Sequence, residues 1–543
     1  MSRYLKRLPH YAYKHRGIVV VLLTIGLIYI FFTILGYKSS YYKILDLQVF
    51  PDTLYYSAPA WNFVHGYSFD MAIRDFLHIP HFVTPLYPIL LIPFFLFFSL
   101  QGFIVLNTLL LLTSITCICL ALYNIKRPHL STLQIFSLLL LYICLPVVIK
   151  MPLQLMSEAP TIAAMSLLVY ILCRRIDTTR TLLPAFIIGW LMYFIKQSNI
   201  FIFFPIVLLY LWHEYFVLKR KGFAPLAIVV CISVVSALFS YAYGIISYDT
   251  LVDPDRKESI FLISTFIPHF VFYAKTLIGL NAQNEFIVSL MPMPLKWETA
   301  RIVSPLIGLM VVFGFFRNYK DKRILYLAFI GCVYVVGMSF FGSTDHRYAY
   351  VLLPVLWVFC AFGLASLSNK MYVKNIFILV LVASILFVPI LSNDKTVSTI
   401  VYLRDILTRQ QSDYDFYRTI EIMNKHTEDN TSQKMYLLTF LPEFYTQYFT
   451  NGKYTILPIS TEQEFFWDSR TKMWQQYNLP TDYVGYLRER LLAGDQLYIT
   501  DTHGRKQRDW KTFFDGVTRD FQLEKVLSIS DKGYAIYRIL LKQ

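Results

Sequence analysis

Charged residues are scarce in this chain: they make up 16% of its 543 residues, whereas hydrophobic residues make up 56%. A soluble globular domain has about 25% charged residues, so the composition excludes an ordinary soluble fold and indicates a polytopic membrane protein. The 45 Phe and 40 Tyr residues agree with this, because aromatic side chains are abundant at membrane interfaces. The net charge of +15 does not indicate nucleic-acid binding, since the Lys and Arg residues lie in short segments between apolar runs.

Cysteine is also scarce. All seven cysteines lie in apolar segments, and the long polar C-terminal region has none. This placement argues against a disulfide framework and against a Cys-based metal site, and it predicts small buried residues.

We also expect no cleavable signal sequence. Basic residues precede an apolar run at 17–36, which is too long for a signal peptide and lacks a small-residue exit. We therefore expect an uncleaved first span with its N-terminus in the cytoplasm.

Long apolar runs are what the sequence has in abundance. With about 17–25 residues per span, we predict about eleven transmembrane helices. They are expected near residues 17–36, 103–123, 132–150, 157–174, 181–196, 198–215, 223–245, 303–317, 323–341, 350–367 and 375–393.

The apolar run 84–99 is ambiguous because it contains Pro85, Pro88 and Pro93. If it crossed the membrane, the basic cluster Lys126-Arg127 and every later cluster would lie outside, against the positive-inside rule. We therefore expect a juxtamembrane or re-entrant segment there.

The predicted fold is a polytopic α-helical membrane protein with a C-terminal α/β domain outside the membrane. Residues 1–393 form the transmembrane module, with outer loops at 37–83 and 246–301, and residues 394–543 form the outer domain. The latter region is charged and contains strand-like runs at 435–440, 454–457, 496–500 and 534–539.

Two acids stand out on the predicted outer face. Asp52 follows Pro51 in the first outer loop, and Ser157-Glu158 opens a span with Pro160 in its first turn. Either carboxylate could instead cap a helix N-terminus.

Several basic residues lie on the same predicted outer face, although the positive-inside rule disfavours basic residues there. Lys196 sits between two apolar runs, and His346-Arg347 lies in a very short outer turn. Such placement indicates an anionic partner, and Arg is suited to bidentate phosphate contact. The alternatives are a snorkelling lysine and an Asp345–Arg347 pair.

A metal site is not favoured. Asp253 and Asp255 resemble a metal motif, but Pro254 between them indicates a turn. Jointly, the outer residues predict a cavity with carboxylates on one wall and cations on another. Such a cavity fits transfer of a group from a phosphate leaving group: an acid accepts the acceptor's proton, and Lys and Arg stabilise the phosphate charge.

These residues resemble, in order and spacing, the GT-C superfamily of membrane glycosyltransferases, most closely the branch of protein O-mannosyltransferases and the lipid A aminoarabinose transferase. The matching motifs are Pro51-Asp52 with Tyr55, His65-Gly66-Tyr67-Ser68, Thr84-Pro85-Leu86-Tyr87-Pro88, Ser157-Glu158, Lys196-Gln197-Ser198 before Phe204-Pro205, and His346-Arg347-Tyr348 before Leu353-Pro354. The chain departs from the branch at Asp52-Thr53, where an Asp-Glu pair is common, and at Val83-Thr84-Pro85, where several relatives have Lys-Pro-Pro.

The resemblance implies an inverting transferase that uses a polyprenyl-phosphate-linked sugar at the outer face of the plasma (inner) membrane. It implies Asp52 as the general base and Glu158 as a second catalytic residue, which orients the acceptor or helps to bind a metal. It further implies the site residues Lys196, His346 and Arg347 for the donor phosphate, and Tyr55, Tyr56, His65 and Tyr348 for substrate. Undecaprenyl phosphate is the carrier we expect; the acceptor is a lipid, glycan or protein, and no cofactor is expected.

Two other functions remain open. A lipid-linked saccharide transporter or flippase is the main alternative, although transport usually needs ionisable residues at mid-membrane depth and the predicted spans have few. A membrane-anchored binding protein is the third, but it does not explain ten further spans.

Overall fold

The computed structural model describes residues 16–38, 52–66, 69, 84–124, 130–176, 178–242, 252–253, 258–259, 263–281, 304–340, 347–367, 370–386, 434–439, 454–459, 465–468, 473–476, 482–501, 510–528 and 535–542. The chain divides into two compact units. One comprises residues 1–64 and 82–409, and the other comprises residues 65–81 and 410–543. Residues 387–433 lie outside the described ranges, so the predicted domain boundary at 393 stays a prediction.

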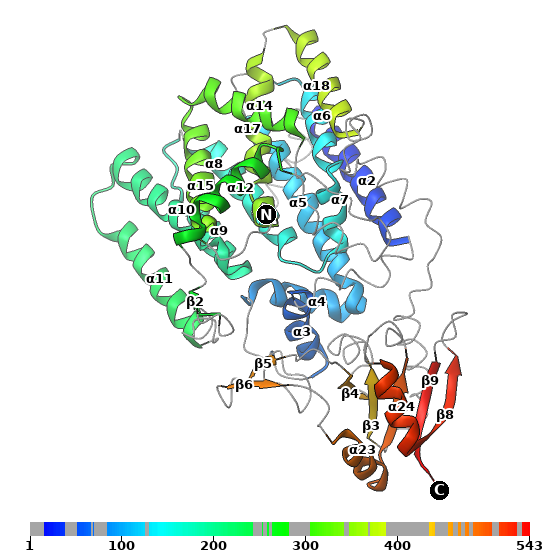
Figure 1. The fold of residues 1–543 in the computed structure, drawn as a ribbon. Coiled ribbons are helices and arrows are strands. Elements are labelled where there is room, and N and C mark those ends of the chain that lie inside the picture. Colours follow the sequence, from blue (N-terminus) through cyan, green and yellow to red (C-terminus); the bar gives the residue numbers. More distant parts are fainter. Residues whose placement is uncertain are drawn as a thin grey trace, which may run out of the picture. The chain divides into compact units, whose positions relative to one another are not determined.

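The first unit is helical (Figure 1). Its main helices are α2 (Arg16–Lys38), α5 (Gly102–Asn124), α6 (Thr132–Ile143), α8 (Glu158–Arg175), α9 (Leu183–Ile195), α10 (Ile200–Trp212), α11 (Ala224–Ala242), α12 (Phe266–Leu277), α14 (Pro305–Asn318), α15 (Lys322–Ser339), α17 (Leu353–Leu367) and α18 (Met371–Leu386). Every expected span thus contains a helix. Four helices are long and apolar enough to cross a membrane by themselves, or five if one bent pair counts as a span. The total of eleven stays a prediction.

The helix in the expected span at 132–150 is broken in its middle. α6 ends at Ile143, α7 (Pro146–Lys150) follows, and the segment Val147–Leu153 lies at an angle of 74° to α6. Pro146 disfavours a helical conformation of the residue before it, and Leu145 is indeed extended, with φ −64° and ψ 129°.

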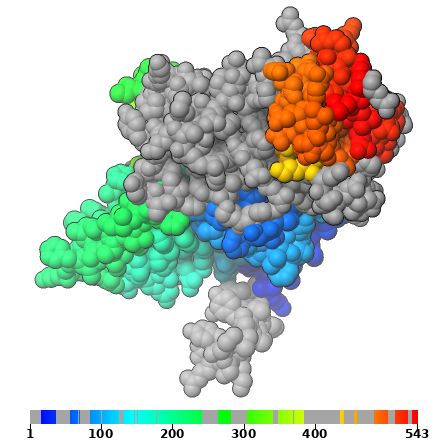
Figure 2. Space-filling view, turned by 90° about the horizontal axis from the view of Figure 1, so that it is seen from below, coloured from blue at the N-terminus to red at the C-terminus, as the bar shows by residue number. Residues whose placement is uncertain are grey.

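Two short helices lie at one end of this unit. α3 (Asp52–Val64) packs against α4 (Leu86–Phe98), and α4 packs in turn against α5 and α9. Figure 2, which views the molecule from below, shows atoms of this blue segment on that end of the unit. The 13 residues of α4 span about 20 Å at 1.5 Å per residue, less than the ~30 Å of a bilayer core. This length is consistent with the expected non-crossing segment.

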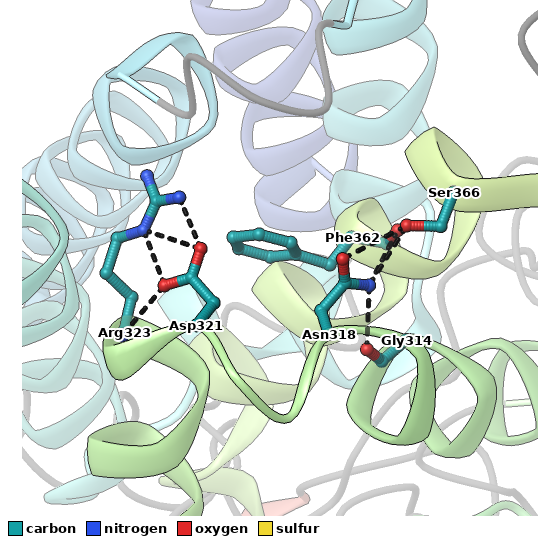
Figure 3. Close-up of polar contacts among 6 residues, drawn as sticks. All are labelled: Gly314, Asn318, Asp321, Arg323, Phe362 and Ser366. Atoms are coloured by element: carbon teal, nitrogen blue, oxygen red, sulfur yellow. Dashed lines mark hydrogen bonds and ion pairs between the residues drawn. The ribbon is translucent and has the colours of Figure 1, made fainter.

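α14 and α17 pack backbone to backbone. A side chain at Gly314 would overlap the carbonyl oxygen of Phe359, so only glycine permits this approach. Asn318 closes the end of the interface: its Nδ2 donates to the Gly314 carbonyl at 3.0 Å and to Ser366 Oγ at 3.0 Å (Figure 3).

The second unit is built on a mixed sheet with the strand order β4-β3-β7-β9-β8. The strands are β3 (Met435–Thr439), β4 (Tyr454–Pro458), β7 (Gln496–Thr500), β8 (Phe521–Ser528) and β9 (Ala535–Leu541), and β3 pairs in parallel with both β4 and β7. Residues of α23 (Tyr483–Leu492) and α24 (Trp510–Asp520) contribute Leu487 and Val517 to its buried core. All four predicted strands are therefore present, and the α/β character of this region is confirmed.

Two pairs of short strands complete the described structure. β5 (Phe465–Asp468) and β6 (Met473–Gln476) form an antiparallel pair. β1 (Val252–Asp253) and β2 (Glu258–Ser259) do the same in the first unit, so the chain reverses direction between Asp253 and Glu258. The turn predicted at Pro254 lies outside the described residues.

Candidate functional site

An ion pair joins two of the predicted site residues. Lys196 Nζ lies 3.0 Å from Glu158 Oε1, and the two side chains are 18% and 3% exposed. Glu158 is the first residue of α8, and Lys196 follows α9 in an extended conformation with φ −155° and ψ 130°. The extended residue ends α9 before the short 3-10 turn η3 (Gln197–Asn199) begins. Lys196 therefore stays within the protein and does not snorkel.

From the sequence we expected Glu158 and Lys196 on opposite walls of a cavity. The structure does not place them so. They form one pair in direct contact. The second carboxylate oxygen, Glu158 Oε2, is buried and accepts no hydrogen bond within the described residues. This oxygen is therefore without a donor among the described residues.

Tyr348 and Arg347 complete the cationic side of the site. The Nζ atom of Lys196 lies 4.7 Å from the centre of the Tyr348 ring, within the range of a cation–π contact. Tyr348 is in α16 (Arg347–Tyr350), and its carbonyl accepts a hydrogen bond from Tyr334 Oη at 2.8 Å. Arg347 directly precedes Tyr348 in α16 and so belongs to the segment that contacts Lys196. Two of the three predicted phosphate-binding cations are thereby brought together.

Tyr56 connects α3 to the start of α8. Its hydroxyl donates to Ser157 Oγ at 2.9 Å, next to Glu158 in the chain. Both Tyr56 and Ser157 are buried. Asp52 occupies the first position of α3, four residues before Tyr56, so the two positions share a helical face.

A second hydrogen-bond chain holds the same region together. Tyr87 Oη donates to Asn107 Oδ1 at 2.9 Å, and Asn107 Nδ2 donates to the Gln154 carbonyl at 2.6 Å. The rings of Tyr87 and Tyr56 meet edge to face with centres 5.6 Å apart. α3, α4, α5 and the segment before α8 are therefore fixed by buried polar contacts.

The remaining predicted residues are described only in part. His346 and the side chains of Asp52 and Tyr55 lie outside the described residues. His65 is exposed and groups with the second compact unit. Among the residues whose placement is described, no group of three or more His, Cys, Asp or Glu side chains could hold a metal ion.

Sequence reasoning missed the second layer of the site. Tyr87, Asn107 and Tyr334 support it. Tyr87 belongs to a motif quoted for the resemblance but was given no role, and Asn107 carried a signal because an amide inside a transmembrane helix needs a partner. Tyr334 resembles an ordinary core residue.

An apolar cavity of about 330 Å³ lies within the helical unit. Its lining comes from α12, α14, α15 and α17, and it includes Phe270, Val311, Gly331, Leu352 and Phe359. Leu352 follows α16 directly in the chain, and α12 contacts both α15 and α16. The α16 segment that carries Arg347 and Tyr348 therefore leads into this cavity.

The fold and the site define a polytopic α-helical membrane protein with a small sheet domain, whose polar site lies at the ends of its helices. The same fold occurs in ArnT from Cupriavidus metallidurans, the lipid A aminoarabinose transferase of the GT-C class. The ArnT structure bound to undecaprenyl phosphate has a TM-score of 0.57 and 12% identity, and the match covers 96% of this chain and 97% of that one. The ArnT structure in the apo state has a TM-score of 0.56 and 11% identity, and the match covers 97% of this chain and 98% of that one.

No protein-family model and no curated protein sequence matches this chain. At 11–12% identity the likeness to ArnT is one of fold. The fold is the one that the GT-C resemblance of the sequence implied.

Proposed function

We propose that this protein is a glycosyltransferase that moves a sugar from a polyprenyl-phosphate donor to an acceptor on the outer face of the membrane. The observation that carries the proposal is the segment α16, which holds Arg347 and places Tyr348 against Lys196, and which is followed two residues later by Leu352 in the lining of an apolar cavity. A polyprenyl phosphate fits these two features, because its anionic head can contact the cations and its apolar tail can lie in the cavity. ArnT, which has the same fold, binds undecaprenyl phosphate.

The cations stabilise the leaving group in this proposal. As the bond between the anomeric carbon and the phosphate oxygen breaks, negative charge builds on the phosphate, and fixed positive charges lower the barrier. Lys196 and Arg347 supply these charges, together with His346, which neighbours Arg347 in the chain. The tail lies in the cavity between α12, α14, α15 and α17.

Asp52 is the proposed general base. It accepts the proton of the acceptor hydroxyl while the acceptor oxygen attacks the anomeric carbon from the face opposite the phosphate, which inverts the configuration. Support comes from α3, which places the Asp52 position on the same helical face as Tyr56, and Tyr56 is bonded to the residue before Glu158.

The roles of the other residues follow from these contacts. Glu158 holds Lys196 in place and is a second catalytic residue through its other oxygen, to which no described residue donates. Tyr348 lies against Lys196, and Tyr55 and His65 are proposed to bind substrate. The Tyr56 hydroxyl has a partner inside the protein, so we propose that Tyr56 positions α3 and does not bind substrate.

We further propose an inner-membrane protein with about eleven spans, a cytoplasmic N-terminus and an extracytoplasmic C-terminal domain. The transferred group is a hexose or a pentose, and the acceptor is a lipid, glycan or protein. The reaction as written needs no cofactor.

Release of polyprenyl phosphate tests the proposal. Purified protein is incubated with undecaprenyl-phosphoryl sugars and membrane acceptors, and undecaprenyl phosphate is measured. The wild type should release it, and Asp52→Asn should not, while its melting temperature stays unchanged. Full release by Asp52→Asn overturns the role of Asp52, and no release with any donor overturns the transferase in favour of a transporter.

A further inference from the structure

The helical path between α9 and α10 is interrupted where the sequence has no helix breaker. The four residues 196–199 are Lys, Gln, Ser and Asn, without glycine or proline, yet Lys196 is extended with φ −155° and ψ 130°. The helices on both sides are apolar, so a change in hydropathy does not mark the interruption either. A contact made by the residues at the interruption must therefore stabilise it.

Asn199 makes this contact. Its side chain is fully buried, and its Nδ2 donates to the Met192 carbonyl at 2.9 Å. The same carbonyl accepts from the backbone N of Lys196 at 3.1 Å, and the backbone N of Asn199 donates to the Lys196 carbonyl at 3.0 Å. Asparagine side chains favour such bonds to nearby backbone groups over a continuous helix. Asn199 thus ties the chain on both sides of Lys196.

The extended backbone at Lys196 directs its side chain into the site. From this position Nζ reaches Glu158 Oε1 at 3.0 Å and lies 4.7 Å from the centre of the Tyr348 ring. A lysine has a long flexible stem, so the place of its ammonium depends on where the backbone starts the side chain. A fixed backbone and two side-chain contacts prepare the ammonium for an anion before the anion binds.

We propose that Asn199 is a positioning residue that acts on the donor phosphate through Lys196. This inference rests on the proposed function, which assigns the donor phosphate to Lys196. Without the bond from Nδ2 to the Met192 carbonyl, the turn at 196–199 loses the side-chain contact that stabilises it, and the ammonium loses its fixed place. Asn199 should therefore matter for the phosphate of the lipid and not for its tail.

The test compares two lipids that differ only in the phosphate, undecaprenyl phosphate and undecaprenol. Dissociation constants are measured for the full-length protein in detergent, and the ratio of the two constants is the phosphate preference. Lys196→Gln should lower this preference about tenfold, because a hydrogen bond to a charged group is lost. Asn199→Ala should lower it at least about threefold, since a misplaced cation keeps only part of that bond.

Two further variants separate positioning from packing. Asn199→Leu has nearly the shape of asparagine and should lower the phosphate preference as Asn199→Ala does, so that a cavity is not the cause. Asn318→Ala is the matched control, because Asn318 Nδ2 also donates to a carbonyl of its own helix, that of Gly314, at 3.0 Å. It should lower the melting temperature and leave the phosphate preference unchanged.

The double variant of Asn199→Ala and Lys196→Gln completes the test. Its phosphate preference should equal that of Lys196→Gln alone, because two residues that act through one contact are not additive. Additive losses overturn the inference, as does an unchanged preference in both Asn199 variants while Lys196→Gln loses it. An unchanged preference in Lys196→Gln overturns the inference together with the proposed phosphate site.

Discussion

Lys196 and Glu158 are 38 residues apart in the chain, yet their side chains meet at 3.0 Å in a place where water has little access. Neither charge is stable there alone, because a partly buried ion loses most of its hydration. The pair therefore fixes the junction of α9 and η3 against the start of α8. It also holds the cation that we propose to contact the donor phosphate.

Removal of one partner of this pair should destabilise the protein more than removal of both. Glu158→Gln leaves the charge of Lys196 without its partner, and we expect the free energy of unfolding to fall by about 3 kcal/mol. This value is at the low end of the range for buried ion pairs, because Lys196 is partly exposed. Lys196→Gln should act similarly. The double variant should lose less than the sum, which chemical denaturation in detergent would measure.

The exposed Arg174 offers a control for the loss of a charge on the same helix as Glu158. Arg174→Gln should change stability by less than about 1 kcal/mol, as expected for a surface interaction. If the two single losses simply added in the double variant, the ion pair would not be the source of the effect.

The hydrogen bond between Tyr56 and Ser157 should affect turnover more than donor binding. Tyr56→Phe removes only the hydroxyl that ties α3 to the start of α8, so Asp52 should be less well placed. We expect kcat to fall about tenfold, since small misplacements of a catalytic group cost this much or more. KM for the donor should stay nearly unchanged, as steady-state kinetics would show.

Ser157→Ala should reproduce the effect, and the double variant should be no worse than either single one. Amide hydrogen exchange in α3 should rise in both variants, a readout that needs no activity. A rise in donor KM with Tyr56→Phe but not with Ser157→Ala would contradict positioning and favour direct substrate contact.

Gly331 allows the apolar cavity to be filled without disturbing the fold. It lines the cavity, and a Cβ atom added there would meet no other atom within 4 Å. Gly331→Leu should therefore keep or raise stability, because glycine is about 1 kcal/mol worse than other residues in a helix. It should raise KM for an undecaprenyl donor severalfold but leave a short-chain donor unaffected.

Gly314→Ala is the contrasting variant, because its side chain would overlap the backbone of Phe359. It should lower the melting temperature and reduce activity with both donors alike. Unchanged kinetics of Gly331→Leu with the undecaprenyl donor would place the lipid tail elsewhere.

Cysteine labelling should establish the topology. In a variant without native cysteines, Lys126→Cys should resist a membrane-impermeant maleimide added from outside, whereas His346→Cys should react. The reason is the positive-inside rule, which puts the segment before α6 in the cytoplasm if α4 does not cross. Labelling at position 126 would mean that α4 crosses the membrane.

Much of the architecture was predictable because lipid imposes a simple rule. A chain in a bilayer must satisfy its backbone hydrogen bonds within helices, so apolar runs mark the helices. Strand-like runs such as 496–500 and 435–440 likewise marked the sheet of the second unit. The break at Pro146 shows the limit, since hydropathy is uniform through 132–150 while the backbone bends there.

The sequence alone determined the membrane class, the positions of the helices and the residue types of the site. Only the tertiary structure decided that Glu158 and Lys196 pair and that Tyr56 is bonded to Ser157. The physical reason is the range of the forces. Hydropathy acts locally along the chain, whereas the pairing of charges and hydroxyls depends on which helix ends meet in space.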